Sequence, residues 1–182
     1  MKRWEKLAVG AALAVAVGFV AFRLRYAPYQ IPQNGMYPGL PAKSHFYARK
    51  HPYARVEEVQ RGDIIVFRRQ RPDGVYDFVW RVVALPGDRI AIRDDSVVVN
   101  GYPLHRNPGP DDGQMRFYEE TAGTQTYRIA LPIRPAQAAD LPETTVPAGH
   151  LFVLGDNRHD AADSRTMGPI PFESIVARAG WW

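Results

Sequence analysis

The chain has 182 residues, enough for one domain with a real hydrophobic core. Its 23 lysines and arginines outnumber its 19 acidic residues, giving a net charge of +4, and it contains no cysteine. The lack of cysteine excludes disulfides and thiol chemistry. No recognition helix, zinc spacing or aromatic RNA-binding pattern accompanies the basic charge, so we expect no nucleic-acid partner and favour a lipid membrane.

The N-terminal segment predicts a membrane anchor. A basic head, MKRWEK, precedes sixteen uncharged residues at 7–22, and Arg23 and Arg25 end the run. In a helix the run spans about 24 Å, short of the roughly 30 Å hydrocarbon core unless Arg23 snorkels to the headgroups. A cleaved signal peptide and a buried helix are the alternatives, but bulky, basic residues follow the run. We expect residues 1–25 to form a cytoplasmic head and a single transmembrane helix in the cytoplasmic membrane, with the main domain on the extracytoplasmic side.

The remainder, residues 26–182, predicts a mainly β domain. Sixteen prolines and fifteen glycines favour short strands and turns over long helices. Segments rich in β-branched and aromatic residues occur at 62–69, 78–85, 88–104 and 150–157, and the third of these is typical of a hairpin that turns at Asp94-Asp95. Residues 104–147 are rich in proline, glycine and polar residues. We expect a β-barrel-type core with a small inserted subdomain at 104–147.

Three stretches carry the strongest patterns. PQNGMYPGL runs over 32–40, RVVALPGD over 81–88 and GDNRHDAADSRTMGPIP over 155–171. Taken singly, each fits a structural role, because PGD after a strand is a common turn and GDN followed by charged residues is a common solvated loop. Their order behind an apolar N-terminal segment is more informative than any one of them.

In this order the stretches resemble the type I signal peptidase family of serine endopeptidases. The third is the most specific, and its matching residues are Gly155, Asp156, Asn157, Arg158, Asp163, Ser164, Arg165 and Gly168. RGDIIVF before the second stretch and VNGYPL after it also match. The resemblance implies an outward-facing β domain near the membrane, with a groove that takes a preprotein segment as an added strand.

The resemblance also implies a serine nucleophile and a lysine general base, and this sequence has neither. A serine hydroxyl attacks only when a base takes its proton, and lysine is such a base when burial lowers its pKa. The nucleophile position holds Gly35, and the base position holds Trp80, whose indole nitrogen only donates. The position of an oxyanion donor holds Gln33, and that of a hydroxyl that orients the base holds Ala161.

The residues around these positions match the family and are expected to form groove or scaffold. In the first two stretches they are Pro32, Met36, Pro38, Leu40 and Arg81. In the third stretch we expect loop and ion-pair structure, with Asp163 and Arg165 forming a partly buried pair. Trp80 is expected to fill the space beside Gly35 and so to close the groove at that point.

Chemistry elsewhere in the chain has little support. The serines are Ser44, Ser96, Ser164 and Ser174. Lys43 adjoins Ser44, so in a strand their side chains point to opposite faces, and a Ser164–His159 pair lacks a third group to orient it. The acidic residues and histidines that cluster in sequence are His150, Asp156, His159, Asp160 and Asp163. They lack the paired spacing of a metal site, so we expect neither a metal nor another cofactor.

These observations predict a membrane-anchored signal peptidase homologue without the Ser/Lys machinery. It would bind an exported preprotein, a signal-peptide segment or an envelope assembly partner without cleavage. The alternatives are an active endopeptidase that removes signal peptides by a relocated or altered nucleophile, and a purely structural envelope protein. The basic and aromatic stretch at 42–55 fits either a solvated strand pair or a membrane-surface patch.

Overall fold

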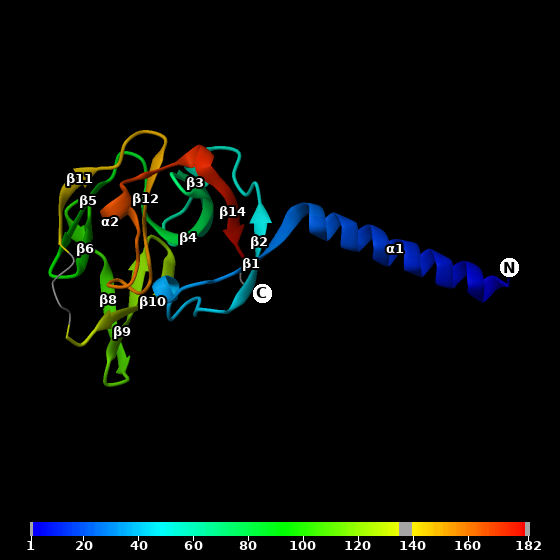
Figure 1. Ribbon diagram of the computed structural model, residues 1–182, viewed down its shortest axis with the longest axis horizontal. Helices are drawn as coiled ribbons and strands as arrows, with labels where there is room; N and C mark the ends of the chain where they lie inside the picture. Colours follow the sequence, from blue (N-terminus) through cyan, green and yellow to red (C-terminus); the bar gives the residue numbers. More distant parts are fainter. Residues whose placement is uncertain (1, 135–139, 181–182) are drawn as a thin grey trace.

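The computed structural model describes residues 2–134 and 140–180 and is mainly β, as the sequence predicts (Figure 1). One long helix, α1 (Arg3–Arg25), extends away from a body of strands. The remaining helical elements are single turns: α2 (Ser164–Met167), η1 (Asn34–Met36), η2 (Val56–Glu58) and η3 (Phe172–Ser174).

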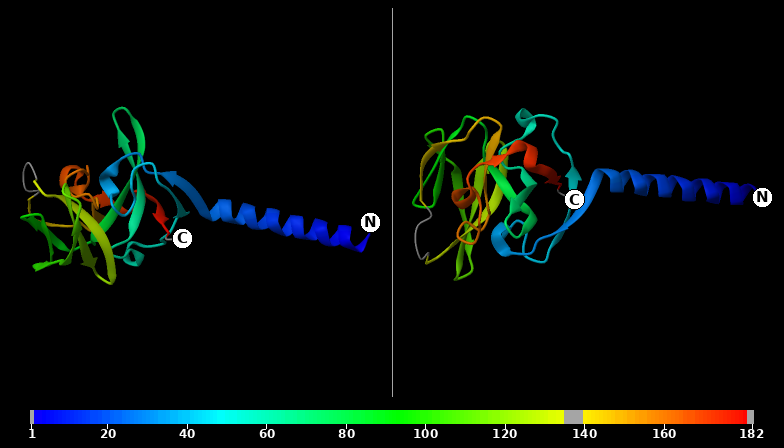
Figure 2. Two further views of the ribbon diagram at one scale, coloured as in Figure 1. Left: turned by 90° about the horizontal axis from the view of Figure 1, so that it is seen from below. Right: turned by 45° about the horizontal axis from the view of Figure 1, so that its top comes forward.

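The largest sheet has the strand order β1-β2-β14-β3-β4-β12-β13, and its neighbouring strands are antiparallel. Its strands are β1 (Tyr26–Gln30), β2 (His45–Lys50), β3 (Ile64–Arg71), β4 (Gly74–Ala84), β12 (His150–Leu154), β13 (Ile170–Pro171) and β14 (Ile175–Ala179). Strand β4 pairs with β3 along its first part and with β12 only near its end. The tip of the β3–β4 hairpin therefore projects from the body, as the left view of Figure 2 shows.

Two smaller sheets occupy the side of the body away from α1 (Figure 1). The order β11-β5-β6-β7 comprises β5 (Arg89–Arg93), β6 (Ser96–Val99), β7 (Tyr102–Pro103) and β11 (Leu141–Thr145). The order β10-β9-β8 comprises β8 (His105–Asp111), β9 (Met115–Ala122) and β10 (Gln125–Pro132). The expected hairpin at 88–104 is confirmed, since Asp94 and Asp95 adopt positive φ between β5 and β6. Most of the predicted insertion forms β8–β10 and β11, while its residues 135–139 lie outside the described part.

Strand β3 shows how the sequence builds the core. Its segment IIVF is buried at every position, with an exposed fraction of 4% or less for each side chain. Ile65 and Phe67 pack in one apolar cluster with Trp80, whereas Val66 packs in another on the opposite face. A strand covered on both faces needs a continuous apolar run rather than alternation, which is what this segment supplies.

The predicted transmembrane span is not supported. Across the residues that the structure describes, no helix is long and apolar enough to cross a membrane. The uncharged run is short, it contains many alanines and two glycines, and arginines end it. The segment is nevertheless helical over Arg3–Arg25.

The last turn of α1 is tied to the strands that follow it. The Phe22 ring stacks on Tyr26 with 5.0 Å between ring centroids and meets the Tyr47 ring edge-on at 5.3 Å. Lys50 Nζ donates to the carbonyl oxygen of Arg23 at 2.9 Å, satisfying one of the free carbonyls at the end of the helix. These contacts attach the helix to the β1–β2 pair.

Candidate functional site

Gly35 is buried in η1, and the structure leaves no room for a side chain there. A Cβ at this position would lie 2.5 Å from Cη2 and 2.6 Å from Cζ3 of Trp80, and 3.1 Å from the carbonyl oxygen of Asp160. Such distances are well inside van der Waals contact, so a side chain at position 35 would force its neighbours to move. Trp80, on β4, thus fills the space beside Gly35, as the sequence predicts.

The loop after β12 closes the other side of this contact. A Cβ at Gly155 would lie 2.3 Å from the Cβ of Ala161, 2.5 Å from the carbonyl oxygen of Gly35 and 3.1 Å from Cζ3 of Trp80. The Asn157 backbone N–H donates to the same Gly35 carbonyl at 3.0 Å. Gly35, Trp80, Gly155 and Ala161 therefore form one close-packed unit, which we call the packed centre.

The packed centre contains no side chain that can act as a nucleophile or a base. Three of its members are glycine or alanine, and the indole of Trp80 carries only a donor. That donor, Nε1, is buried, and within the described residues it has no hydrogen-bond partner. Gln33 is exposed at the start of η1, where its side chain makes no capping bond.

The structure does not bring a serine and a base together in the part that it describes. Ser164 is buried, and its hydroxyl accepts the backbone N–H of Val153 at 3.0 Å. His159 pairs with Asp95 instead, with 2.8 Å between Nε2 and Oδ1. The other serine hydroxyls with a recorded bond, those of Ser44 and Ser174, each donate to a backbone carbonyl.

The five acidic residues and histidines that cluster in sequence do not converge on a common point. Among the described residues, no group of three or more histidine, aspartate or glutamate side chains is placed to hold a metal ion. Asp156 and Asp163 are each committed to an arginine, and His150 Nδ1 lies 2.9 Å from the carbonyl oxygen of Ala148.

A buried ion pair lies directly behind the packed centre. Arg81 and Asp156 are exposed by only 2% and 1%, and they form a bidentate pair with both N–O distances at 2.7 Å. Arg81 also donates to the carbonyl of Gly62 at 2.8 Å and lies 3.9 Å above the centre of the Tyr127 ring. Burial lowers the pKa of Arg81, but the Asp156 carboxylate outweighs it and raises that pKa above its ordinary value. A Cβ at Gly39 would lie 2.7 Å from Asp156 Oδ2, so this geometry of the pair favours glycine at position 39.

A second buried ion cluster joins the same loop to the three-stranded sheet. The Glu120 carboxylate, fully buried on β9, accepts bonds from Arg158 at 3.1 Å, Arg106 at 2.7 Å and the Tyr127 hydroxyl at 2.9 Å. Burial raises the pKa of Glu120, but the two guanidinium groups outweigh it and lower that pKa to about 2. Sequence reasoning identified Arg158 as scaffold but missed Glu120, because nothing local distinguishes it from its exposed neighbour Glu119.

The expected pair of Asp163 and Arg165 is confirmed. Their side chains form a bidentate pair with N–O distances of 2.8 and 2.7 Å, and Asp163 is fully buried. Asp163 also accepts the backbone N–H of Gly155 at 2.9 Å, so this pair fixes the loop at the packed centre. The pair thus helps to position the packed centre through the backbone of Gly155.

A groove of about 430 Å³ opens beside the packed centre. One wall comes from β1 and η1, over Tyr29–Gln33 with Gly35 and Met36, and the other comes from β4, over Tyr76–Trp80. In the described chain, β1 pairs only with β2, and residues 74–80 of β4 pair only with β3. The groove therefore lies between two strand edges whose outer sides have no partner strand.

The groove separates the predicted residues into two groups. Pro32, Gln33, Gly35, Met36 and Trp80 line it. Leu40 packs against the apolar clusters, and the ion pairs of the third stretch lie behind the packed centre.

The three stretches that resemble the signal peptidase family thus meet at one site in a mainly β domain. Comparison with known families agrees, since the family described as "Signal peptidase, peptidase S26" matches residues 1–182. The chain belongs to this family.

Individual relatives are similar at a moderate level. Signal peptidase I of Pseudomonas fluorescens is 30% identical over 178 residues, covering 84% of this chain, which spans only 62% of that protein's length. Signal peptidase I of Bacillus caldolyticus is 31% identical over 179 residues, covering 97% of this chain and 87% of the relative. A crystal structure of a signal peptidase I from Enterococcus faecalis V583 matches 66% of this chain and 96% of its own, at 28% identity and a TM-score of 0.41.

Proposed function

We propose that this chain is a non-cleaving member of the signal peptidase family that binds an extended segment of an exported protein. The observation that carries the proposal is the contact of Trp80 with Gly35. It leaves no nucleophile, no base and no room for a side chain at the position where the family places its serine. Acyl transfer needs an activated nucleophile, so a segment bound here is held and not cut.

Strand addition is the binding mode that the groove favours. An extended segment that enters between β1 and β4 can pair its backbone with strand edges that are otherwise unpaired. Ile31 bonds to the β2 side through both its N–H and its C=O. Because hydrogen-bonding directions alternate along a strand, the N–H and C=O of Gln30 point toward the groove and can bind such a segment.

We propose that α1 attaches the domain to the cytoplasmic membrane, with the domain on the extracytoplasmic side. Apolar side chains are exposed on the described part of the helix, including Leu13 at 65%, Val17 at 60% and Phe19 at 63%. Exposed apolar side chains that no other part of the described protein covers are suited to a lipid environment. Arg23 and Arg25 then lie near the anionic headgroups, beside the aromatic contacts of Phe22.

The bound segment is, in this proposal, part of a preprotein or signal peptide. A segment of an envelope assembly partner is the alternative, and it would use the same strand edges. Crosslinking of intact chains distinguishes binding from cleavage for either source.

The experiment is site-specific photo-crosslinking with the full chain in detergent micelles. A photoreactive phenylalanine analogue replaces Gln33 in the groove wall, and in a control protein it replaces Tyr102 on β7, which is 78% exposed. We expect a purified preprotein to crosslink at position 33 and not at position 102, with a mass equal to the sum of both intact chains. An absence of crosslinking at position 33, or release of a shortened preprotein, contradicts the proposal.

A further inference from the structure

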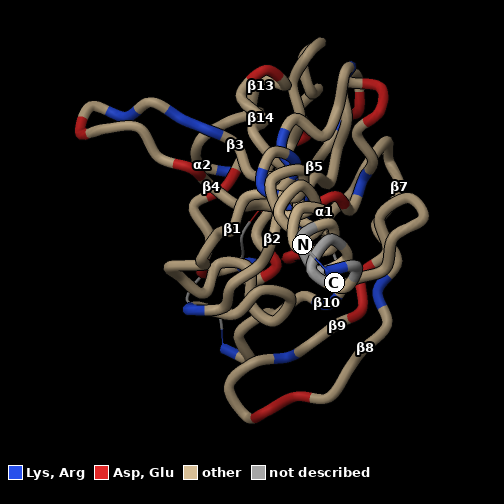
Figure 3. The backbone as a smooth tube through the Cα atoms, turned by 90° about the vertical axis from the view of Figure 1, so that its right-hand side faces the viewer, with Lys and Arg blue, Asp and Glu red and all other residues tan. Residues whose placement is uncertain are grey.

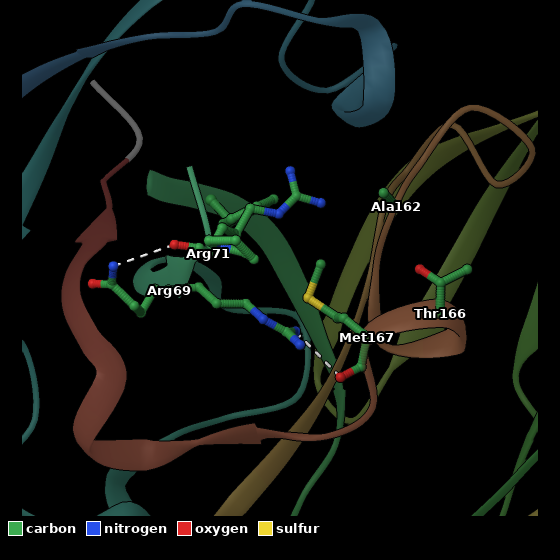
Figure 4. Close-up of a pocket in the computed structure, with 8 residues that line it drawn as sticks. Arg69, Arg71, Ala162, Thr166 and Met167 are labelled. Carbon is green, nitrogen blue, oxygen red and sulfur yellow. Dashed lines mark hydrogen bonds between the residues drawn. The ribbon is translucent and has the colours of Figure 1, made fainter. Parts of the chain in front are cut away.

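A second cavity, of about 360 Å³, continues the groove toward the tip of the β3–β4 hairpin. The two cavities share Arg71, Phe78 and Ala162, so they adjoin each other. The second cavity is lined further by Arg69 and by residues of α2. In Figure 4 the side chains of Arg69 and Arg71 extend from the hairpin toward the segment that carries Ala162 and Met167.

Arg69 and Arg71 differ in their contacts from Arg68, which lies on the other face of the hairpin. Arg68 forms an ion pair with Asp77, with 2.8 Å between Nε and Oδ1. Alternation along β3 places Arg69 and Arg71 on the opposite face from Arg68. Arg69 donates to the carbonyl of Met167 at 3.2 Å, and the Arg71 guanidinium lies 5.5 Å from the centre of the Phe78 ring.

Neither Arg69 nor Arg71 has a carboxylate partner among the residues that the structure describes. Figure 3 shows the positive charge on the β3 side of the projecting hairpin, with acidic residues at its tip and on its other strand. Two guanidinium groups that border one cavity and lack anionic partners are suited to a carboxylate, which arginine binds through paired N–H donors.

We infer that this cavity binds an acidic side chain of the segment held in the groove, and that it gives the groove a preference for acidic sequences. The inference rests on the proposed function, because the groove must first hold an extended segment. The register of the hairpin sets the spacing. Arg69 lies opposite Tyr76, four positions along β4 from Trp80. At about 3.3 Å per residue, the acidic residue lies about four residues, or roughly 13 Å, from the residue beside the packed centre.

The test is a glutamate scan of a bound peptide. The probes are ten-residue peptides of alternating alanine and threonine with an amidated C-terminus, labelled with tetramethylrhodamine. One glutamate, or one glutamine as its neutral match, is moved through successive positions. Binding to the full chain in nonionic detergent is measured by fluorescence anisotropy at low salt. We expect glutamate at one or two adjacent positions to bind about fivefold more tightly than glutamine there, and 0.5 M NaCl to reduce this preference.

Three variants connect the preference to the cavity. In Arg69→Gln the ratio of glutamate to glutamine affinity should fall toward one, while the affinity for the glutamine peptides stays unchanged, because Arg69 lines only the second cavity. In Arg71→Gln the same ratio should fall toward one, and the affinity for both peptide series changes as well, because Arg71 also lines the groove. Arg68→Gln is the matched control, because it removes one positive charge from the opposite face of the same strand. It should keep the preference. Circular dichroism of each variant checks that the fold is intact.

The outcomes separate the inference from the proposed function. Peptides that bind with no glutamate preference, or with a preference that survives in the Arg69 and Arg71 variants, contradict the inference alone. Equal loss of the preference in Arg68→Gln also overturns it, because general charge then explains the effect. If no peptide of either series binds, the proposed function fails, and the inference fails with it.

Discussion

The packed centre and the ion pairs behind it are neighbours in sequence and in space, yet they differ in kind. Trp80 belongs to an apolar contact without catalytic groups, while the next residue, Arg81, forms a bidentate pair with a buried carboxylate. The adjacent residues Gly155 and Asp156 show the same contrast. Gly155 belongs to the packed centre, and Asp156 is the buried carboxylate that pairs with Arg81. Buried ion pairs thus lie directly beside a packed centre that holds no nucleophile and no base.

The packed centre and the ion pairs are therefore subject to different physical constraints. Buried charges must keep their partners, because removing one leaves the other unpaired in a low-dielectric interior. A nucleophile and its base carry no such structural requirement, so glycine and tryptophan can pack where they would stand. The buried ion pairs are explained by the stability of the fold, so their presence says nothing about cleavage activity.

The largest effect should come from breaking the buried pair. Arg81→Met leaves Asp156 without its partner and should lower the free energy of unfolding by about 3–5 kcal/mol. Urea denaturation in nonionic detergent, followed by near-ultraviolet circular dichroism, measures it. The control is Arg89→Met, since Arg89 and Glu143 form an exposed pair that should be worth less than about 1 kcal/mol. Similar losses of unfolding free energy in both variants would mean that the buried pair stabilises the fold no more than an exposed pair.

The second effect is a loss of stability in acid that depends on Glu120. Its pKa of about 2 in the folded protein is lower than the ordinary glutamate pKa of 4.5. The stabilisation is therefore fully present above pH 4.5 and is lost as the pH falls toward 2, by roughly 3 kcal/mol in total. Glu120→Gln lacks this titration, so the difference in unfolding free energy between the two proteins should shrink between pH 5 and pH 2. A difference that stays constant over this range contradicts the assignment.

The third and smallest effect concerns the packed centre itself. Gly35→Ser introduces a side chain against the Trp80 ring and should cost about 1–3 kcal/mol of stability. In a Trp80→Ala background the cost should be smaller by at least about 1 kcal/mol, because the two residues are in contact. Val97→Ala, on β6 in a separate apolar core, is the control background and should leave the cost of Gly35→Ser unchanged. If Gly35→Ser costs the same stability in both backgrounds as in the native chain, Gly35 and Trp80 are not in close contact.

Local patterns predicted much of the fold. The apolar run in β3, the turn at Asp94 and Asp95 and the Asp163–Arg165 pair all depend on residues close in sequence. The apolar run at 7–22 was correctly expected to be helical, and the helix extends beyond it over Arg3–Arg25. The predicted membrane span is not supported, because no helix of the described residues is long and apolar enough.

Features that depend on long-range packing were only partly predictable. The contact between Gly35 and Trp80 was expected because the family resemblance placed both positions at one site. No such guide existed for Glu120, whose partners Arg106 and Arg158 lie on other elements. Arg69 and Arg71 share a strand face by simple alternation, but the cavity between them forms only when α2 packs against the hairpin.

A cleavage assay on one preprotein in liposomes tests the central claim most directly, with three proteins compared: the native chain, Gly35→Ser, and Gly35→Ser with Trp80→Lys. We predict that the native chain and the single variant leave the preprotein intact, because neither has a base and Trp80 still fills the site. The double variant has a serine and a lysine at the two positions and should produce a trace of shortened product. Cleavage by the native chain would contradict the account and direct the search to a nucleophile elsewhere, beginning with Ser44 and Ser164.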